Sequence, residues 1–143
     1  MYVPVSMEAA IALSKLDPKY IFDDDELYYV IEDYNTKVEV DNCITHYSYS
    51  KGNKIDYMDW YHVPDDLLVR AYDLYRVIDY IEDEYSIVID YRKDYDTLRY
   101  YPVLSRGKEI LVSMPDGYES KRECYNTAII EAIKWLTDGS DEH

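Results

Sequence analysis

The sequence predicts an α+β fold in which about three helices pack on an antiparallel sheet, in the order α-ββββ-α-βββ-α. Two observations carry this prediction. Runs with period-2 alternation follow one another directly, and three other segments show helical spacing or capping residues. Strands and helices do not alternate, so a parallel sheet is not expected. The 143 residues are expected to form one compact domain, 1–143, with a disordered tail at 139–143.

The first and last helices are predicted from their capping residues. Ser6 precedes "MEAAIALSKL" and can cap a helix there, which must stop near Asp17 because Pro18 restricts that residue. Ser120 and Glu123 form an S-x-x-E capping box before the last helix. That helix carries an apolar stripe of Tyr125, Ile129, Ala132, Ile133 and Leu136.

The middle helix has the clearest apolar periodicity in the chain. It is predicted to open at Pro64, with Asp65 and Asp66 at the positive end of the helix dipole. Its apolar stripe consists of Leu67, Ala71, Leu74, Ile78 and Ile81. The letters "VIDY" occur at the end of this helix, at 77–80, and again at 88–91, where alternation predicts a strand. The tetrapeptide is therefore read as an accident of composition and not as a repeat.

Four strands are predicted between the first two helices, as two hairpins. Asp23–Glu26 could begin a helix, but the aromatic and β-branched residues that follow favour a strand at Leu27–Glu32. It would turn near Tyr34–Thr36 and return at Lys37–Asp41. The second hairpin would turn at 51–53 ("KGN") and return through residues 55–61.

Three strands are predicted between the second and third helices. They lie in "YSIVIDYR", at Thr97–Leu104 and at Glu109–Met114. Pro102 cannot donate a backbone hydrogen bond, which predicts that its strand lies at a sheet edge.

Charge is the most informative part of the composition. Thirty acidic against 15 basic residues give a net charge of −15, which disfavours direct binding to nucleic acid or to an anionic membrane. Such a chain attracts basic protein surfaces, although acidity can also serve solubility alone. Two cysteines make no disulfide framework, and neither a leader nor a membrane-spanning segment is expected. A cytoplasmic protein is expected.

No motif predicts catalysis or a cofactor. "PDGYESK" at 115–121 contains elements of a metal-dependent nuclease, but they lie too close together and are better explained by helix capping. Cys43, His46, His62 and Cys124 are the available zinc ligands, without a zinc-site spacing. Asp23–Glu26 and Asp94–Asp96 lack the Gly and distal Glu of a calcium loop. Basic patches with interleaved aromatics are absent from the sequence. We expect no enzyme, no metal and no cofactor, with a small metal-assisted hydrolase as the alternative.

Two acidic segments are the candidate contact surface for a partner. Residues 17–41 carry nine acids and two bases, and residues 65–96 carry ten acids and four bases. The 19 tyrosines add rings with polar tips, which are common at interfaces. The predicted partner-binding residues are Asp23, Asp24, Asp25, Glu26, Asp65, Asp66, Asp73, Glu82, Asp83, Glu84, Asp94, Tyr95 and Asp96.

These features predict an acidic interaction protein that occupies a basic, nucleic-acid-binding surface of a partner. In size, charge and layout the chain resembles small acidic proteins carried by phages and mobile elements, including antirestriction and anti-CRISPR nucleic-acid mimics. The resemblance implies a phage-encoded inhibitor of a host defence system and carries over no individual residue. The alternative is a non-catalytic accessory or oligomer-forming protein whose acidity serves only solubility.

Overall fold

Three helices and three antiparallel sheets make up the computed structural model, which describes residues 2–18, 21, 27–56 and 62–139. The helices are α1 (Met7–Ser14), α2 (Leu74–Tyr85) and α3 (Lys121–Lys134), with a 3-10 turn η2 (Asp65–Leu67) and a π-type turn η3 (Trp135–Gly139). The strands are β1 (Tyr28–Val30), β2 (Tyr34–Val40), β3 (Cys43–Tyr49), β4 (Lys54–Ile55), β5 (Leu68–Arg70), β6 (Val88–Asp94), β7 (Arg99–Arg106) and β8 (Glu109–Ser113). The predicted α+β class is confirmed, with a fifth strand added before α2. Of the tail expected at 139–143, only Gly139 belongs to the described residues.

The predicted caps of α1 and α3 are confirmed. Ser6 Oγ accepts a hydrogen bond from the Ala9 backbone N–H at 3.1 Å. Ser120 Oγ accepts one from the Glu123 N–H, also at 3.1 Å. Each serine satisfies a first-turn donor that has no partner within its own helix. The segment 115–121 therefore contains the N-cap of α3, as the capping interpretation predicted.

The predicted start of the middle helix is wrong. Pro64 precedes only the 3-10 turn η2, and α2 begins ten residues later with Asp73 as its N-cap. The intervening strand β5 pairs with β1, so backbone pairing takes residues 68–70 away from the helix. The apolar spacing of Leu67 and Ala71 fits a helix by periodicity alone, and tertiary pairing outweighs it.

The strand pairing predicted for the first half is also wrong. β2 pairs with β3 over seven residue pairs, through a two-residue turn at Asp41 and Asn42. These two residues have φ values of 52° and 65°, as a type I′ turn requires, and Asp and Asn tolerate that region. The turn predicted at Tyr34–Thr36 lies inside β2. The expected return strand is short, because β4 ends at Ile55 and residues 57–61 lie outside the described part.

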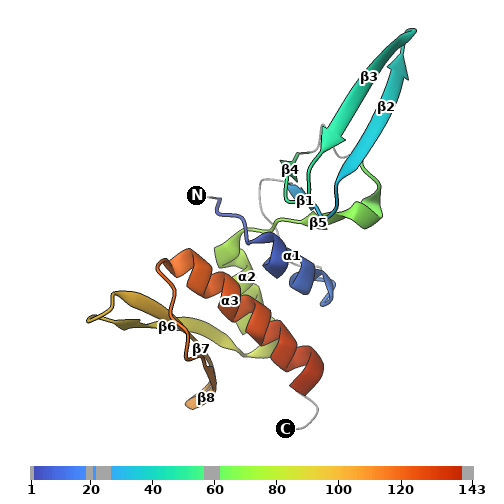
Figure 1. The fold of residues 1–143 in the computed structure, drawn as a ribbon. Coiled ribbons are helices and arrows are strands. Elements are labelled where there is room, and N and C mark those ends of the chain that lie inside the picture. The colour runs from blue at the N-terminus through green and yellow to red at the C-terminus, as the bar shows by residue number, and fades with distance from the viewer. Residues whose placement is uncertain (1, 19–20, 22–26, 57–61, 140–143) are drawn as a thin grey trace.

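The β2–β3 hairpin, residues 34–49, forms a sheet of its own and is called the arm below. Figure 1 shows it projecting away from the helices. The second sheet has the order β4-β1-β5, and the third has the order β6-β7-β8. The arm is thus the one described part of the chain in which two strands pair without a third.

Pro102 lies in a central strand, contrary to the edge position predicted for it. β7 pairs with β6 on one side and β8 on the other, and Pro102 is opposite Tyr91. Its carbonyl accepts a hydrogen bond from the Met114 N–H at 3.2 Å, on the β8 side. Pairing with β8 ends at Val103. The backbone N–H that Pro102 lacks would therefore lie just beyond the paired part of β8.

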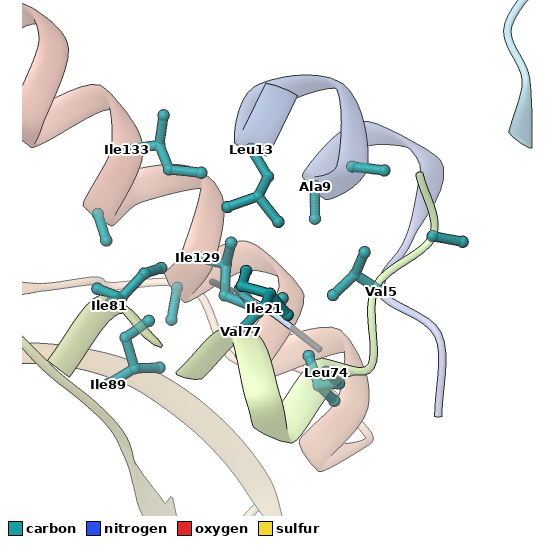
Figure 2. Packing of buried hydrophobic residues seen from close by; sticks show 14 of the residues in the cluster. Val5, Ala9, Leu13, Ile21, Leu74, Val77, Ile81, Ile89, Ile129 and Ile133 are labelled. Atoms are coloured by element: carbon teal, nitrogen blue, oxygen red, sulfur yellow. The ribbon is translucent and has the colours of Figure 1, made fainter. Parts of the chain in front are cut away.

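The main core lies between the helices and one face of the β6-β7-β8 sheet. Figure 2 shows side chains from α1, α2, α3 and the sheet converging, among them Leu13, Leu74, Ile81 and Ile129. A second, smaller cluster joins Val30, Tyr49, Ile55 and Val63 at the base of the arm. No helix within the described residues is long and apolar enough to cross a membrane.

Candidate functional site

The predicted partner-binding residues occupy several separate places in the fold. Asp23, Asp24, Asp25 and Glu26 lie outside the described residues. Asp65 and Asp66 are exposed on η2, and Glu82, Asp83 and Glu84 are exposed in the last turn of α2. Asp94 ends β6, and Tyr95 and Asp96 follow it in the exposed β6–β7 turn.

Asp73 does not belong to any contact surface. Its side chain is 7% exposed, so the prediction that it contacts a partner is wrong. One carboxylate oxygen accepts from the Val3 N–H at 2.8 Å, and the other from the Arg76 N–H at 3.3 Å. The sequence could have indicated this, because Asp73 is followed at once by a helical stripe and is a preferred N-cap residue.

The acidic groups on α2 and on the β6–β7 turn lie at opposite ends of the same hairpin. Arg106, at the end of β7, donates to the Tyr85 carbonyl at 2.9 Å, which places the end of α2 beside this end of the sheet. The register runs from Val88 opposite Ser105 to Asp94 opposite Arg99. The seven residues of β6 separate the two ends by a distance of about 20 Å. The acids thus form separate patches, and the densest described one is on α2.

The acids on α2 follow helical spacing on its exposed face. Asp79, Glu82 and Asp83 are at positions i, i+3 and i+4, and Glu84 adjoins them. Residues at these spacings have Cβ atoms about 5–6 Å apart, so Asp79, Glu82 and Asp83 form a compact group, and Glu84 extends it around the helix. No basic residue follows Arg76 within α2. We call Asp79, Glu82, Asp83 and Glu84 the α2 acidic patch.

Several basic side chains of the β6-β7-β8 region lie over aromatic rings. The guanidinium of Arg92 is 4.6 Å from the ring centre of Tyr101, and that of Arg106 is 4.9 Å from Trp135. The ammonium of Lys93 is 5.1 Å from the ring centre of Tyr100. These cations interact with the negative faces of the rings.

A tyrosine cluster joins α3 and the sheet, and it reaches α2 through Tyr75, whose ring centre is 6.1 Å from that of Tyr125. Tyr91 makes edge-to-face contacts with Tyr100 and Tyr125, whose ring centres are 5.2 and 5.9 Å away. Lys121 lies over Tyr91 at 5.1 Å, and hydrogen bonding to that tyrosine raises the pKa of Lys121. Burial raises the pKa of Tyr125, with the charge of Asp90 adding to the effect.

Cations and aromatic rings that are separated in the sequence meet across the β6–β7 hairpin. The hairpin register places Lys93 opposite Tyr100 and Arg92 opposite Tyr101. Asp90 and Asp94 lie on the same strand, so the cluster is not a basic patch of the kind that binds a phosphate backbone.

The cysteines and histidines are dispersed. Cys124 is fully buried in α3, where desolvation raises its pKa to about 11. Cys43 and His46 are exposed on the arm, and His62 stacks on Tyr47 with ring centres 4.1 Å apart. Among the described residues, no three His, Cys, Asp or Glu side chains are placed to hold a metal ion.

Asp94 accepts a hydrogen bond from the Asp96 N–H at 2.9 Å, which closes the β6–β7 turn.

Comparison with known proteins gave no matching family model, no similar curated protein and no similar solved structure.

Proposed function

We propose that this chain is an acidic interaction protein that presents exposed carboxylates to a basic, nucleic-acid-binding surface of a partner protein. The observation that carries the proposal is the α2 acidic patch, four exposed acids within six residues of one helix. A row of carboxylates at fixed spacing on a rigid helix can take the place of backbone phosphates in a basic groove. The acids of η2 and of the β6–β7 turn extend the negative field to other sides of the molecule.

One such partner is a nucleic-acid-handling enzyme of a host defence system. This class is the target implied by the acidic phage-borne proteins that the chain resembles in size and charge. The proposed role is inhibition by occupancy, which requires no catalytic group on this chain. Charge attraction would speed the encounter, and the complex would weaken as salt rises.

Affinity capture with competition tests the proposal. The immobilised chain is exposed to cell lysate at low salt, with and without excess duplex DNA. We expect it to retain a nucleic-acid-binding protein that DNA displaces and that high salt releases. Retention of no basic protein at low salt, or retention that DNA does not affect, would contradict the proposal.

A matched pair of variants locates the contact. The triple variant Glu82→Gln, Asp83→Asn, Glu84→Gln removes three charges from the α2 acidic patch. The control Glu39→Gln, Asp41→Asn, Glu109→Gln removes three exposed charges from other elements. We expect the first variant to lose at least about tenfold in affinity and the control to lose much less, because close charge pairs contribute more than screened distant ones. Equal losses would show that only net charge matters and that α2 is not the contact.

A further inference from the structure

The two faces of the arm differ in chemistry. Side chains that lie opposite each other in an antiparallel pair share a face, and successive pairs alternate. One face carries four pairs: Tyr34 and Tyr49, Thr36 and Tyr47, Val38 and Thr45, and Val40 and Cys43. We call this the apolar face, since none of its eight residues is charged. The other face carries Asn35, Lys37, Glu39, Ile44, His46 and Ser48, all of which are exposed.

Burial of the apolar face stops halfway along the arm. At its base, Tyr49 is buried in the small cluster, and Tyr34 and Tyr47 pack against that cluster. At its tip, Val40 is 62% exposed, and Cys43 and Thr45 are exposed as well. The described residues of this chain therefore cover the base of the face and leave the tip open. A two-stranded hairpin is only marginally stable in water, so covering the tip would stabilise the arm.

Charge distinguishes between the possible occupants of the open tip. The arm has one lysine, Lys37, against Glu39 and Asp41, a net charge of −1, so the other residues carry −14 of the total of −15. Two copies that met through their acidic bodies would repel each other. Two copies that met through their apolar faces would place no charges in contact. A basic partner gains nothing from a face without carboxylates.

We propose that the distal apolar face of the arm, centred on Val40, Cys43 and Thr45, packs against the same face of a second copy of this chain. A two-fold axis brings identical residues together, which suits an uncharged face. The projection of the arm from the body allows two arms to overlap while their acidic surfaces stay apart (Figure 1). The inference is independent of the proposed function, because it uses no residue of the α2 acidic patch.

The contact is expected to be weak. Half of one face of a hairpin can bury less surface area than the roughly 800 Å² that each partner buries in a standard stable interface. We therefore expect a dissociation constant of about 10–300 µM, and we expect salt to leave it unchanged or to tighten it by screening the repulsion between the bodies. The acidic contact with a partner would respond to salt in the opposite direction, so the two proposals can fail separately.

Sedimentation equilibrium in about 0.3 M salt with a reducing agent tests the inference. The protein concentration is varied from about 10 µM to 1 mM, a range that brackets the expected dissociation constant. The reducing agent removes any contribution from a Cys43 disulfide. The mass of the wild-type chain should rise from 17.1 kDa towards twice that value. Val40→Lys should stay at the mass of one chain throughout. Ile44→Lys is the matched control, because Ile44 is 60% exposed, close to Val40 at 62%, and lies on the opposite face.

Three results would overturn the inference. One is a wild-type chain that keeps the mass of a single copy up to the highest concentration. Another is an Ile44→Lys chain that loses association as fully as Val40→Lys. The third uses Thr45→Lys, which changes a second exposed residue of the apolar face. If Thr45→Lys still associates like the wild type, packing through this face is excluded, even where Val40→Lys has acted by fraying the turn.

Discussion

Single residues with buried polar groups fix how the ends of the elements meet. Asp73 is the clearest case, since it caps α2 and also accepts from the Val3 N–H at 2.8 Å. It therefore ties the N-terminal segment to the start of a helix 70 residues later in the chain. Asn126 has a similar role, because its side-chain oxygen accepts from the Ser6 N–H at 2.7 Å. Both residues hold α1 in place on the rest of the main core.

Replacing Asp73 by Ala should lower the free energy of unfolding by about 2–3 kcal/mol. The change removes an N-cap and leaves the Val3 N–H without this acceptor inside the protein. Chemical denaturation measures the effect. Asp79→Ala is the control, because Asp79 is an exposed acid of the same helix and its loss should matter by less than about 0.5 kcal/mol. Equal effects of the two substitutions would contradict the role assigned to Asp73.

The buried thiol of Cys124 should make the fold sensitive to alkali. Burial raises its pKa from the ordinary 9.0 to about 11. The unfolded chain therefore ionises first as pH rises, and the free energy of unfolding should fall from pH 9 onward, until the folded thiol also ionises. Tyrosines with raised pKa values, such as Tyr80 at about 12, add to the fall only above pH 10.

Urea unfolding at pH 8, 9 and 10 checks this sign. The loss between pH 9 and pH 10 should shrink in Cys124→Ala, which has no thiol to ionise. The same loss in variant and wild type would show that the thiol is not its source.

At the scale of elements, the sequence predicts best where local signals and tertiary pairing agree. The caps at Ser6 and Ser120 and the β6–β7–β8 meander were predictable for that reason. The letters "VIDY" form the helix at 77–80 and the strand at 88–91, as expected. The prediction failed where long-range pairing decided the outcome. β1 pairs with strands 25 and 40 residues away, and nothing in its three residues specifies those partners.

The site follows the same pattern at this scale. Exposed acids on α2 were predictable from helical spacing, although the start of the helix was not. The arm was missed because Asp41-Asn42 was not recognised as a two-residue turn, while the more familiar Gly52 was. The contacts of Lys93 and Arg92 with tyrosines depend on the register of a hairpin, which sequence adjacency does not reveal.

The turn of the arm gives a prediction for this element alone. Asn42 has a φ of 65°, which a β-branched residue adopts only with strain of about 1–2 kcal/mol. Asn42→Val should therefore speed amide hydrogen exchange in residues 34–49 by about 5–30-fold, the factor that corresponds to this free energy. The melting temperature should stay within about 1 °C, because the tip contributes nothing to the main core. Asn42→Gly is the control, and its exchange should be equal to or slower than that of the wild type.

At the scale of the whole molecule, the net charge of −15 is spread over separate acidic patches. Arg92, Lys93, Arg106 and Lys121 lie over aromatic rings, and the α2 acidic patch has no basic residue after Arg76 on its own helix. Repulsion among carboxylates is therefore a cost to the folded state, and it falls when salt screens the charges.

Raising salt from about 0.02 to 0.3 M should increase the melting temperature by roughly 3–5 °C, which corresponds to about 1 kcal/mol for a chain of this size. Thermal unfolding followed by circular dichroism at low protein concentration measures this without a contribution from association. The triple variant of the α2 acidic patch should show a smaller increase. An unchanged or falling midpoint in the wild type would mean that the acids are already neutralised by neighbours.

The packing of α1 on α3 also sets the order in which the chain can fold during synthesis. α1 leaves the ribosome early, but Ile129 and Ile133, which meet it in the main core, are made more than 110 residues later (Figure 2). The cluster of Val30, Tyr49, Ile55 and Val63 is complete much sooner. A ribosome stalled before residue 120 should therefore carry a chain in which the base of the arm can close, while α1 still lacks the α3 side chains against which it packs.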